Sequence, residues 1–323
     1  MKKVRVYFVD FWDGFDFYDN IFYILLSKKY HVIVDPINPD YLFCSCFSYN
    51  VYKYENSVKI YFTGENNVPD FNIYDYAIGF QYVNFEDRYL RFPLYLFYIW
   101  ENLENMNLKH ISGSLTGRKF CNFVYSNKQN ADPIRDKFFF ELSKYKKVDS
   151  GGRLYNNIGG PVKDKCAFLR DYKFTIAFEN SSVNGYTTEK VVEPMLVNSI
   201  PIYWGNKLIG RDFNKSSILV VKDEKDFDRV IDEIKFLDQN DDAYLSKLKQ
   251  NWFVRENEKE HWTDLLMSFL DNIFKQSFLE AKRCPKFGFV KNYIREEKRA
   301  SYLKKNYLWN KMCGLVEKIS NKN

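Results

Sequence analysis

Short apolar runs alternate with helix-like segments in two successive series, and this alternation constrains the fold more than any other feature of the chain. The first series has runs at residues 4–9, 31–34, 41–47, 58–62 and 76–80, and the second at 120–125, 174–178, 200–204 and 218–221. Strands buried on both faces of a parallel sheet have this nearly continuous apolar composition. The pattern predicts an α/β protein with two mostly parallel sheets and a cleft where their strand ends face each other.

Helix signals occupy the gaps between these runs. Asp19 is a candidate N-cap for a helix through 21–29, Asp132 and Pro133 have the N-cap and N1 pattern for a helix over 133–145, and a third helix is expected over 226–237. The 323 residues suffice for about two domains. Because a polar stretch at 109–119 separates the two series, we expect one domain over residues 1–115 and a second over 116–273.

The positive charge of the chain lies in its C-terminal tail, residues 274–323. This tail contains 13 Lys and Arg against four acidic residues, a net charge of +9, so that residues 1–273 carry −3 of the total +6. Apolar residues three and four apart over 301–319 predict an amphipathic helix among the lysines. Such a helix suits an anionic membrane surface, and a solvated or nucleic-acid-attracting tail is the alternative. The acidic body argues against nucleic acid as a partner.

No apolar stretch is long enough to cross a membrane, and the run at 4–9 is too short for a secretion signal. We therefore expect a cytoplasmic protein that is held peripherally at the inner face of the membrane through its tail. The three histidines lie far apart in the sequence, which argues against a histidine-built zinc site and against a histidine-based catalytic triad.

The strongest local signal for chemistry is the segment KFTIAFENSSVNGYTTEK, residues 173–190. It predicts a buried strand, a turn with Gly185 and a helix N-terminus, whose free backbone N–H groups attract anions. Lys190 in the first helical turn opposes the helix dipole, so a bound anion explains its position better than helix stability does. An exposed lysine without a ligand is the alternative. Neither a G-x-G-x-x-G nor a Walker motif is present, so dinucleotide and P-loop binding are not supported.

Two further residues occupy positions typical of functional groups. Glu65 follows the run at 58–62 on a turn with Gly64, where a carboxylate can act as a general base or simply cap the next turn. Arg135 lies in the first turn of the helix expected over 133–145, where a guanidinium group suits a phosphate. Pairing of Arg135 with Asp132 or with solvent is the alternative.

Asp226-Phe227-Asp228 has the D-x-D spacing with which metal-dependent sugar transferases hold a nucleotide diphosphate. Because it follows a charged segment rather than the end of a strand, capping of the following helix is the favoured interpretation.

The motifs join in a resemblance to a known family. They are FTGEN (62–66), YDYAIGF (74–80), DRYLRFPLY (87–95), PIR (133–135), YKFTIAFEN (172–180), GYTTEK (185–190) and IPIYWG (200–205). In this order they resemble the α1,3-fucosyltransferases of glycosyltransferase family 10, above all the bacterial enzymes that make Lewis-type antigens on lipopolysaccharide. The resemblance implies a GT-B fold with two Rossmann-like domains around a central cleft. It also implies inverting transfer of L-fucose from GDP-fucose to an N-acetyllactosamine-type glycan in α1,3 linkage.

The resemblance also implies roles for individual residues. Glu65 corresponds to the general base, Arg135 and Lys190 to cations on the donor diphosphate, Glu189 to a carboxylate near the ribose and fucose, and Asn180 and Tyr186 to donor contacts. Glu189 would favour the positive charge that develops on the attacked carbon, so it counts with Glu65 among the catalytic residues.

The acceptor side is less well defined. Residues 97–118 match the family poorly and are expected to form part of the acceptor surface, and Trp12 and Asp13 are further candidates, although Trp12 could equally belong to the core of so aromatic a chain. No metal is expected to be required, although a divalent cation could stimulate the reaction. A leucine-rich heptad array that some relatives have is absent, and the sequence leaves the oligomeric state open. The remaining alternatives are a non-catalytic nucleotide-sugar or glycan-binding relative and a metal-dependent sugar transferase of another class.

Overall fold

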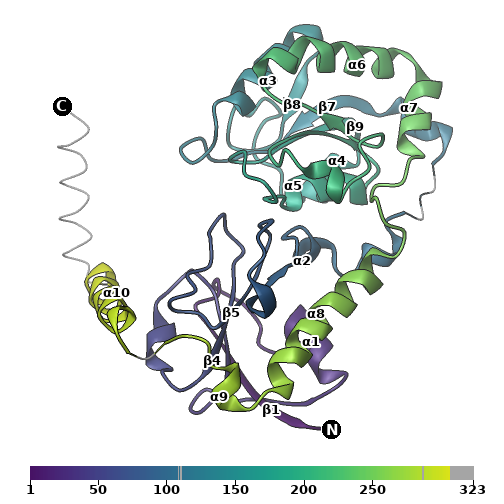
Figure 1. The fold of residues 1–323 in the computed structure, drawn as a ribbon. Helices are drawn as coiled ribbons and strands as arrows, with labels where there is room; N and C mark the ends of the chain where they lie inside the picture. Colours follow the sequence, from purple (N-terminus) through teal and green to yellow (C-terminus); the bar gives the residue numbers. More distant parts are fainter. Residues whose placement is uncertain (108, 110, 286, 306–323) are drawn as a thin grey trace, which may run out of the picture. The chain divides into compact units, whose positions relative to one another are not determined.

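The computed structural model describes residues 1–107, 109, 111–285 and 287–305, and these form two compact units. Unit 1 consists of Met1–Gly79, Val83–Leu90 and the described chain from Leu265 onward. Unit 2 consists of Phe80–Tyr82 and Arg91–Asp264. Each unit is built on one sheet (Figure 1).

The sheet of unit 1 has the strand order β2-β1-β3-β4-β5-β6. Its strands are β1 (Lys3–Val9), β2 (His31–Val34), β3 (Tyr41–Cys44), β4 (Val58–Phe62), β5 (Tyr76–Gly79) and β6 (Tyr89–Arg91). β1 pairs in parallel with β2 and β3, and the β3–β4 and β4–β5 pairs are parallel as well. The five short apolar runs of the first series are therefore β1 to β5, as predicted, whereas β6 was not predicted.

The N-cap of helix α1 (Ile21–Ser27) lies one residue later than predicted. Its N-cap is Asn20, whose side chain accepts a hydrogen bond from the Tyr23 N–H at 3.0 Å. Asp19 was the wrong choice because its own N–H is held by the Asp16 carboxylate at 3.1 Å, which places it in the preceding turn. Asn20 has the extended backbone that an N-cap requires.

The sheet of unit 2 has the order β11-β10-β9-β7-β8. Its strands are β7 (Lys119–Phe123), β8 (Val148–Ser150), β9 (Tyr172–Phe178), β10 (Ile200–Trp204) and β11 (Leu219–Val220), and all paired neighbours are parallel. All residues of β9 and β10 are buried. Figure 1 shows why: α3 (Ile134–Tyr145) and α6 (Phe227–Gln239) cover one face of the sheet, and α4 (Lys165–Leu169) and α5 (Glu189–Leu196) cover the other. The predicted α/β class is confirmed.

The other elements connect or extend the two sheets. They are the short helices η1 (Asn50–Lys53), η2 (Glu86–Arg88), η3 (Leu103–Asn105), η4 (Gly113–Gly117), η5 (Ile209–Arg211) and η6 (Glu224–Asp226), and the α-helices α2 (Leu96–Ile99), α7 (Asp241–Leu248), α8 (Glu258–Lys275), α9 (Phe278–Ala281) and α10 (Phe289–Lys305). Among the described residues, no helix combines the length and the apolar character that spanning a bilayer requires.

The first part of the predicted tail packs into unit 1. Phe274 is fully buried, with its ring 4.4 Å from that of Tyr41, and Asp75 holds Lys282 at 3.0 Å. By contacts, residues 91–115 belong to unit 2 and the described part of 274–323 belongs to unit 1. The domain boundaries at 115/116 and 273/274 stay predictions. Most of the predicted apolar stripe, residues 306–319, lies outside the described residues.

Candidate active site

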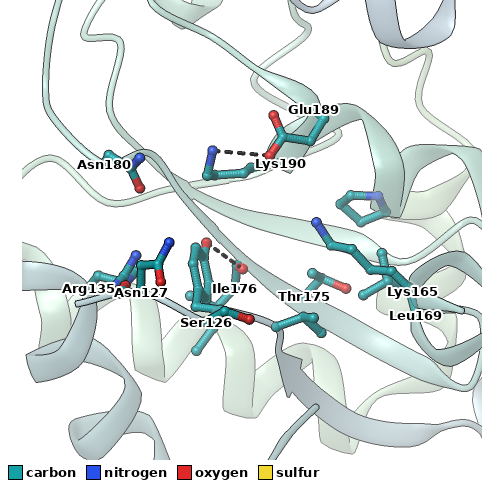
Figure 2. Close-up of a pocket in the computed structure, with 13 residues that line it drawn as sticks. Ser126, Asn127, Arg135, Lys165, Leu169, Thr175, Ile176, Asn180, Glu189 and Lys190 are labelled. Atoms are coloured by element: carbon teal, nitrogen blue, oxygen red, sulfur yellow. Dashed lines mark hydrogen bonds and ion pairs between the residues drawn. The ribbon is translucent and has the colours of Figure 1, made fainter. Parts of the chain in front are cut away.

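A pocket of about 180 Å³ in unit 2 gathers most of the predicted donor-binding residues (Figure 2). It lies where β7 and β9 end and α5 begins, the edge at which parallel α/β sheets hold their ligands. Its lining consists of Val124, Tyr125, Ser126, Asn127, Arg135, Lys165, Leu169, Thr175, Ile176, Asn180, Glu189, Lys190 and Pro194. Four predicted residues, Arg135, Asn180, Glu189 and Lys190, therefore share one pocket.

Lys190 is held in this pocket by carboxylates. Its Nζ lies 3.2 Å from the Glu189 carboxylate and 3.5 Å from that of Glu179, and it donates a hydrogen bond to the Thr188 hydroxyl at 3.0 Å. Burial alone would lower the pKa of Lys190, but the two carboxylates outweigh burial and raise it. The ammonium group therefore stays charged at the N-terminus of α5, where the helix dipole disfavours a cation.

Glu179 is the residue that the sequence analysis missed. It is fully buried directly after β9, and its carboxylate accepts the N–H and the hydroxyl of Thr188, both at 2.8 Å. Burial raises the pKa of Glu179, against the lowering effects of Lys190 and Thr188. A carboxylate directly after a buried strand is the signal that singled out Glu65, and it was available here too.

Gly205 makes room for this buried carboxylate. Its φ is +150°, and a Cβ at this position would lie 2.6 Å from the Cγ of Glu179. Any larger residue would displace Glu179 and, through it, Lys190.

Arg135 enters the pocket from α3. Its guanidinium lies 4.4 Å above the Tyr125 ring, and Nη2 donates to the Asn127 carbonyl at 2.6 Å. Its carboxylate neighbour is Asp136 at 3.6 Å, whereas Asp132 accepts the N–H of Ile134 instead. The buried Nε has no hydrogen bond among the described residues. Arg135 is thus a buried cation fixed on an aromatic ring at the edge of the pocket.

Lys165 is a third cation that the sequence analysis did not single out. It lines the pocket from the first residue of α4 and pairs with Glu193. In Figure 2, Lys190 and Glu189 lie above the pocket, with Arg135 and Asn127 at its left and Lys165 at its right. No motif marked Lys165, because it precedes β9 in a short helix without an obvious sequence signal.

The other predicted donor residues differ in position. Glu189 is ionised: burial would raise its pKa, but Lys190 and Lys165 lower it. Asn180 is half-buried at the pocket. Tyr186 is not part of the lining, and its buried ring lies 5.3 Å from that of Phe80. The roles of all these residues stay predictions.

Glu65 and the acceptor candidates lie in unit 1. Glu65 is exposed on the turn after β4, and its N–H is held by the Thr63 hydroxyl at 2.9 Å. A Cβ on Gly64 would lie 3.7 Å from the Trp12 ring, so this ring flanks the turn. Trp12 is 40% exposed and packs edge-on against Phe15. Trp12 thus contacts a neighbouring aromatic ring and keeps part of its surface open to solvent. The neighbouring Asp13 is exposed.

The D-x-D sequence has a structural explanation. Both carboxylate oxygens of Asp226 accept hydrogen bonds from Arg229, at 2.6 and 2.8 Å, and Asp228 is exposed. Over residues 1–107, 109, 111–285 and 287–305, no three His, Cys, Asp or Glu side chains gather as metal ligands would.

Family models match both halves of the chain. Residues 6–98 match the alpha-(1,3)-fucosyltransferase FucT N-terminal domain, and residues 116–278 match the C-terminal region of glycosyltransferase family 10, the fucosyltransferases. The chain belongs to glycosyltransferase family 10. The family predicted from the sequence motifs is thereby confirmed.

Individual relatives of this family 10 protein agree with the family models. It is 35% identical over 274 residues to the alpha-(1,3)-fucosyltransferase FucT of Helicobacter pylori, an alignment that covers 73% of this chain and 57% of the relative. It is 28% identical over 190 residues to GDP-fucose protein O-fucosyltransferase 3 of Xenopus tropicalis, covering 54% of this chain and 40% of that relative. The chain thus spans little more than half the length of the first relative and less than half of the second.

A solved structure shares the fold. The crystal structure of an α1,3-fucosyltransferase with GDP-fucose matches with a TM-score of 0.70 at 31% identity, over 84% of this chain and 92% of that one. The predicted GT-B class, with two Rossmann-like sheets, is confirmed by this match and by the two parallel sheets observed.

Proposed function

We propose that this protein transfers L-fucose from GDP-fucose, with inversion at the anomeric carbon, to a hydroxyl of an N-acetyllactosamine-type glycan in α1,3 linkage. The observation that carries the proposal is the pocket of unit 2, where three cations from three helices gather at the ends of parallel strands. Membership of a fucosyltransferase family and the fold shared with an enzyme solved with GDP-fucose support this donor. The synthesis of Lewis-type antigens on lipopolysaccharide is part of the same proposal.

The pocket suits the charge that this reaction develops. Breaking the sugar–phosphate bond leaves negative charge on the diphosphate of GDP, which Arg135 and Lys190 would stabilise without a metal. Charge-assisted hydrogen bonds of this kind are worth about 1.5–3 kcal/mol each, or one to two powers of ten in rate. Because its carboxylate neighbours keep Lys190 protonated, its charge is in place before the donor binds.

Glu65 would supply the base. As the acceptor oxygen bonds to the anomeric carbon, its proton passes to the Glu65 carboxylate and the electron pair of the breaking bond leaves with GDP. The exposed turn keeps this carboxylate accessible, and the flanking Trp12 ring offers a surface on which a sugar can stack. Since Glu65 belongs to unit 1 and the donor residues to unit 2, the proposed reaction requires both units.

A glycan array incubated with labelled GDP-fucose is the direct test of donor and acceptor class. Glu65→Gln should lower transfer about a thousandfold while GDP binding is kept, because only the proton acceptor is lost. Glu260→Gln, at an exposed glutamate of α8, is the matched control and should transfer normally. Near-normal transfer by Glu65→Gln would remove Glu65 from its role.

The alternatives make different predictions in the same assay. Full activity in excess chelator would dismiss a metal-dependent transferase, and this is our expectation because Asp226 is engaged by Arg229. A non-catalytic relative would bind GDP-fucose without turnover. The similarity to a protein O-fucosyltransferase makes a protein acceptor a necessary arm of the assay.

We further propose that the protein acts in the cytoplasm at the inner face of the membrane, held there by its basic C-terminal tail. Deletion of residues 306–323, rather than of the whole tail from 274, is the appropriate test, because Phe274 belongs to the core of unit 1. The shortened protein keeps ten of the 13 Lys and Arg of the tail but loses most of the predicted apolar stripe, so it should sediment with membranes less than the full chain and keep transfer to a soluble acceptor.

A further inference from the structure

A second cavity, of about 460 Å³, lies in unit 1 beside the beginning of β4 and α10. We call it the basic cavity, because five of its lining residues are cationic: Lys59, Lys282, Lys291, Arg295 and Lys298. The others are Tyr52, Glu55, Asn56, Ile73, Cys284, Pro285 and Ile294. No sequence motif pointed to it, since its cations come from β4 and from the tail.

The charges around the basic cavity are not balanced. Lys282 pairs with Asp75 at 3.0 Å, and Lys298 pairs with Glu55. Within the part of the chain that the structure describes, the side chains of Lys59, Lys291 and Arg295 have no hydrogen bond or ion pair. The five lining cations and the two carboxylates paired with them sum to an excess of three positive charges.

Part of this excess is built into the unit, because Lys59 is half-buried, whereas Lys291 and Arg295 are exposed on α10. Lys59 is the second residue of β4, in the middle of the sheet order, and its N–H is held by Asp75 at 2.8 Å. Asp75 also accepts the N–H groups of Arg283 and Cys284, each at 2.8 Å, so the same carboxylate fixes both sides of the cavity. The ring of Tyr293 packs on the unit 1 core and its hydroxyl donates to Asp70, which holds α10 in place.

The cations oppose one another unless something negative lies between them. Burial lowers the pKa of Lys59 and the nearby Lys282 lowers it further, against the raising effect of Asp75. Apolar or neutral side chains would satisfy the packing at lower cost. A bound anion would offset the repulsion among these cations and explain why they lie around one cavity.

We propose that the basic cavity binds a phosphomonoester or diphosphate group. Lysines contact phosphate oxygens as point charges, and the guanidinium of Arg295 can form two parallel hydrogen bonds to such a group. Two to three negative charges match the excess of three. The cavity is larger than one phosphate needs, and Ile73 and Ile294 offer apolar contact to the rest of the ligand. The phosphate can belong to a membrane lipid or to a free compound.

Calorimetric titration with inorganic pyrophosphate tests whether the basic cavity binds a phosphate compound that is free in solution. It is run on the full chain carrying Arg135→Ala and Lys190→Ala, so that the pocket of unit 2 does not contribute. We expect Arg295→Gln and Lys59→Gln each to weaken binding about tenfold. The matched controls, Arg299→Gln on the same helix and Lys28→Gln in the same unit, remove the same charge from exposed positions outside the lining and should change it less than about twofold.

Sedimentation with phosphatidylcholine vesicles, with and without phosphatidic acid, tests whether the basic cavity binds the phosphate of a membrane lipid. Phosphatidic-acid-dependent binding that falls with Arg295→Gln but not with Arg299→Gln would assign the cavity to a lipid phosphate. The same selectivity with pyrophosphate alone would assign it to a free phosphate compound. If Arg295→Gln and Arg299→Gln are both folded and bind pyrophosphate and the phosphatidic-acid vesicles equally well, the proposal is wrong. Because Arg295 is exposed on α10, its variant stays informative even if Lys59→Gln fails to fold.

Discussion

Asp75 in unit 1 and Glu179 in unit 2 are both fully buried carboxylates that hold a lysine at the edge of a pocket, yet their pKa values move in opposite directions. Burial would raise the pKa of Asp75, but Lys282 and three backbone N–H groups outweigh it and lower the pKa. Glu179 has one N–H and one hydroxyl donor, and its lysine lies farther away, at 3.5 Å, so burial prevails.

The difference shows how each pocket is organised. All the hydrogen-bonding capacity of Asp75 is used in linking β4, β5 and the tail, and three of the other cations of the basic cavity have no ion pair among the described residues. In the pocket of unit 2, each of the three lining cations has a carboxylate neighbour among the described residues. In the proposed donor complex, hydrogen bonds directed from these cations to the diphosphate would therefore count for more than the net charge of the pocket.

Removal of the Asp75 carboxylate should have the largest effect, a loss of folding stability. Asp75→Ala leaves Lys282 and three buried N–H groups without their acceptor, so we expect the free energy of unfolding to fall by about 3 kcal/mol. Urea unfolding followed by fluorescence measures this loss, and Asp40→Ala, at a partly exposed aspartate paired with Arg5, is the control. A loss below about 1 kcal/mol would mean that water replaces the carboxylate and that its contacts are not structural.

Removing the lysine of the other pocket should affect function rather than stability. Lys190→Ala is expected to lower GDP affinity and to slow fucose transfer about a hundredfold, because a cation on the departing diphosphate is lost. Lys249→Ala, at an exposed lysine in the same unit, should leave both unchanged. Unchanged GDP affinity in Lys190→Ala, measured by calorimetry, would contradict the placement of the diphosphate.

The sequence predicted the strands of both units and the pocket of unit 2, but not the buried carboxylate–lysine pairs in either unit. The apolar runs located the strands because burial on both faces is recorded locally in each run, and the motif at 172–190 located the pocket of unit 2. The Asp75–Lys282 pair joins residues 207 positions apart, which no local periodicity records. The position of Glu179 directly after a buried strand was a signal in the sequence, but its role depends on α5 returning to the end of β9, where Thr188 and Lys190 meet it.

The opposite pKa shifts predict opposite pH dependences of stability. The lowered pKa of Asp75 gives stability that is present above the unfolded pKa, about 3.9, and lost as the pH falls toward its folded value. The raised pKa of Glu179 gives stability that is present below about 4.3 and lost as the pH rises through its folded value.

Urea midpoints recorded between pH 3 and pH 8 test both signs. Asp75→Asn should flatten the loss of stability in acid, and Glu179→Gln should flatten the loss as the pH rises. If the two variants change the profile in the same direction, the contrast between the two carboxylates is wrong.

The smallest expected effect is a gain of stability. Lys59→Met removes a half-buried cation that is repelled by Lys282 and shortens the side chain by only one atom, so the free energy of unfolding should rise by about 0.5 kcal/mol in phosphate-free buffer. With pyrophosphate present, the parent protein should become more stable than Lys59→Met, because pyrophosphate binds the parent protein more tightly and so stabilises it more. Lys28→Met, at an exposed position, should show neither change. A parent protein that is more stable than Lys59→Met without any anion would mean that Lys59 serves the fold by itself and that its charge needs no ligand.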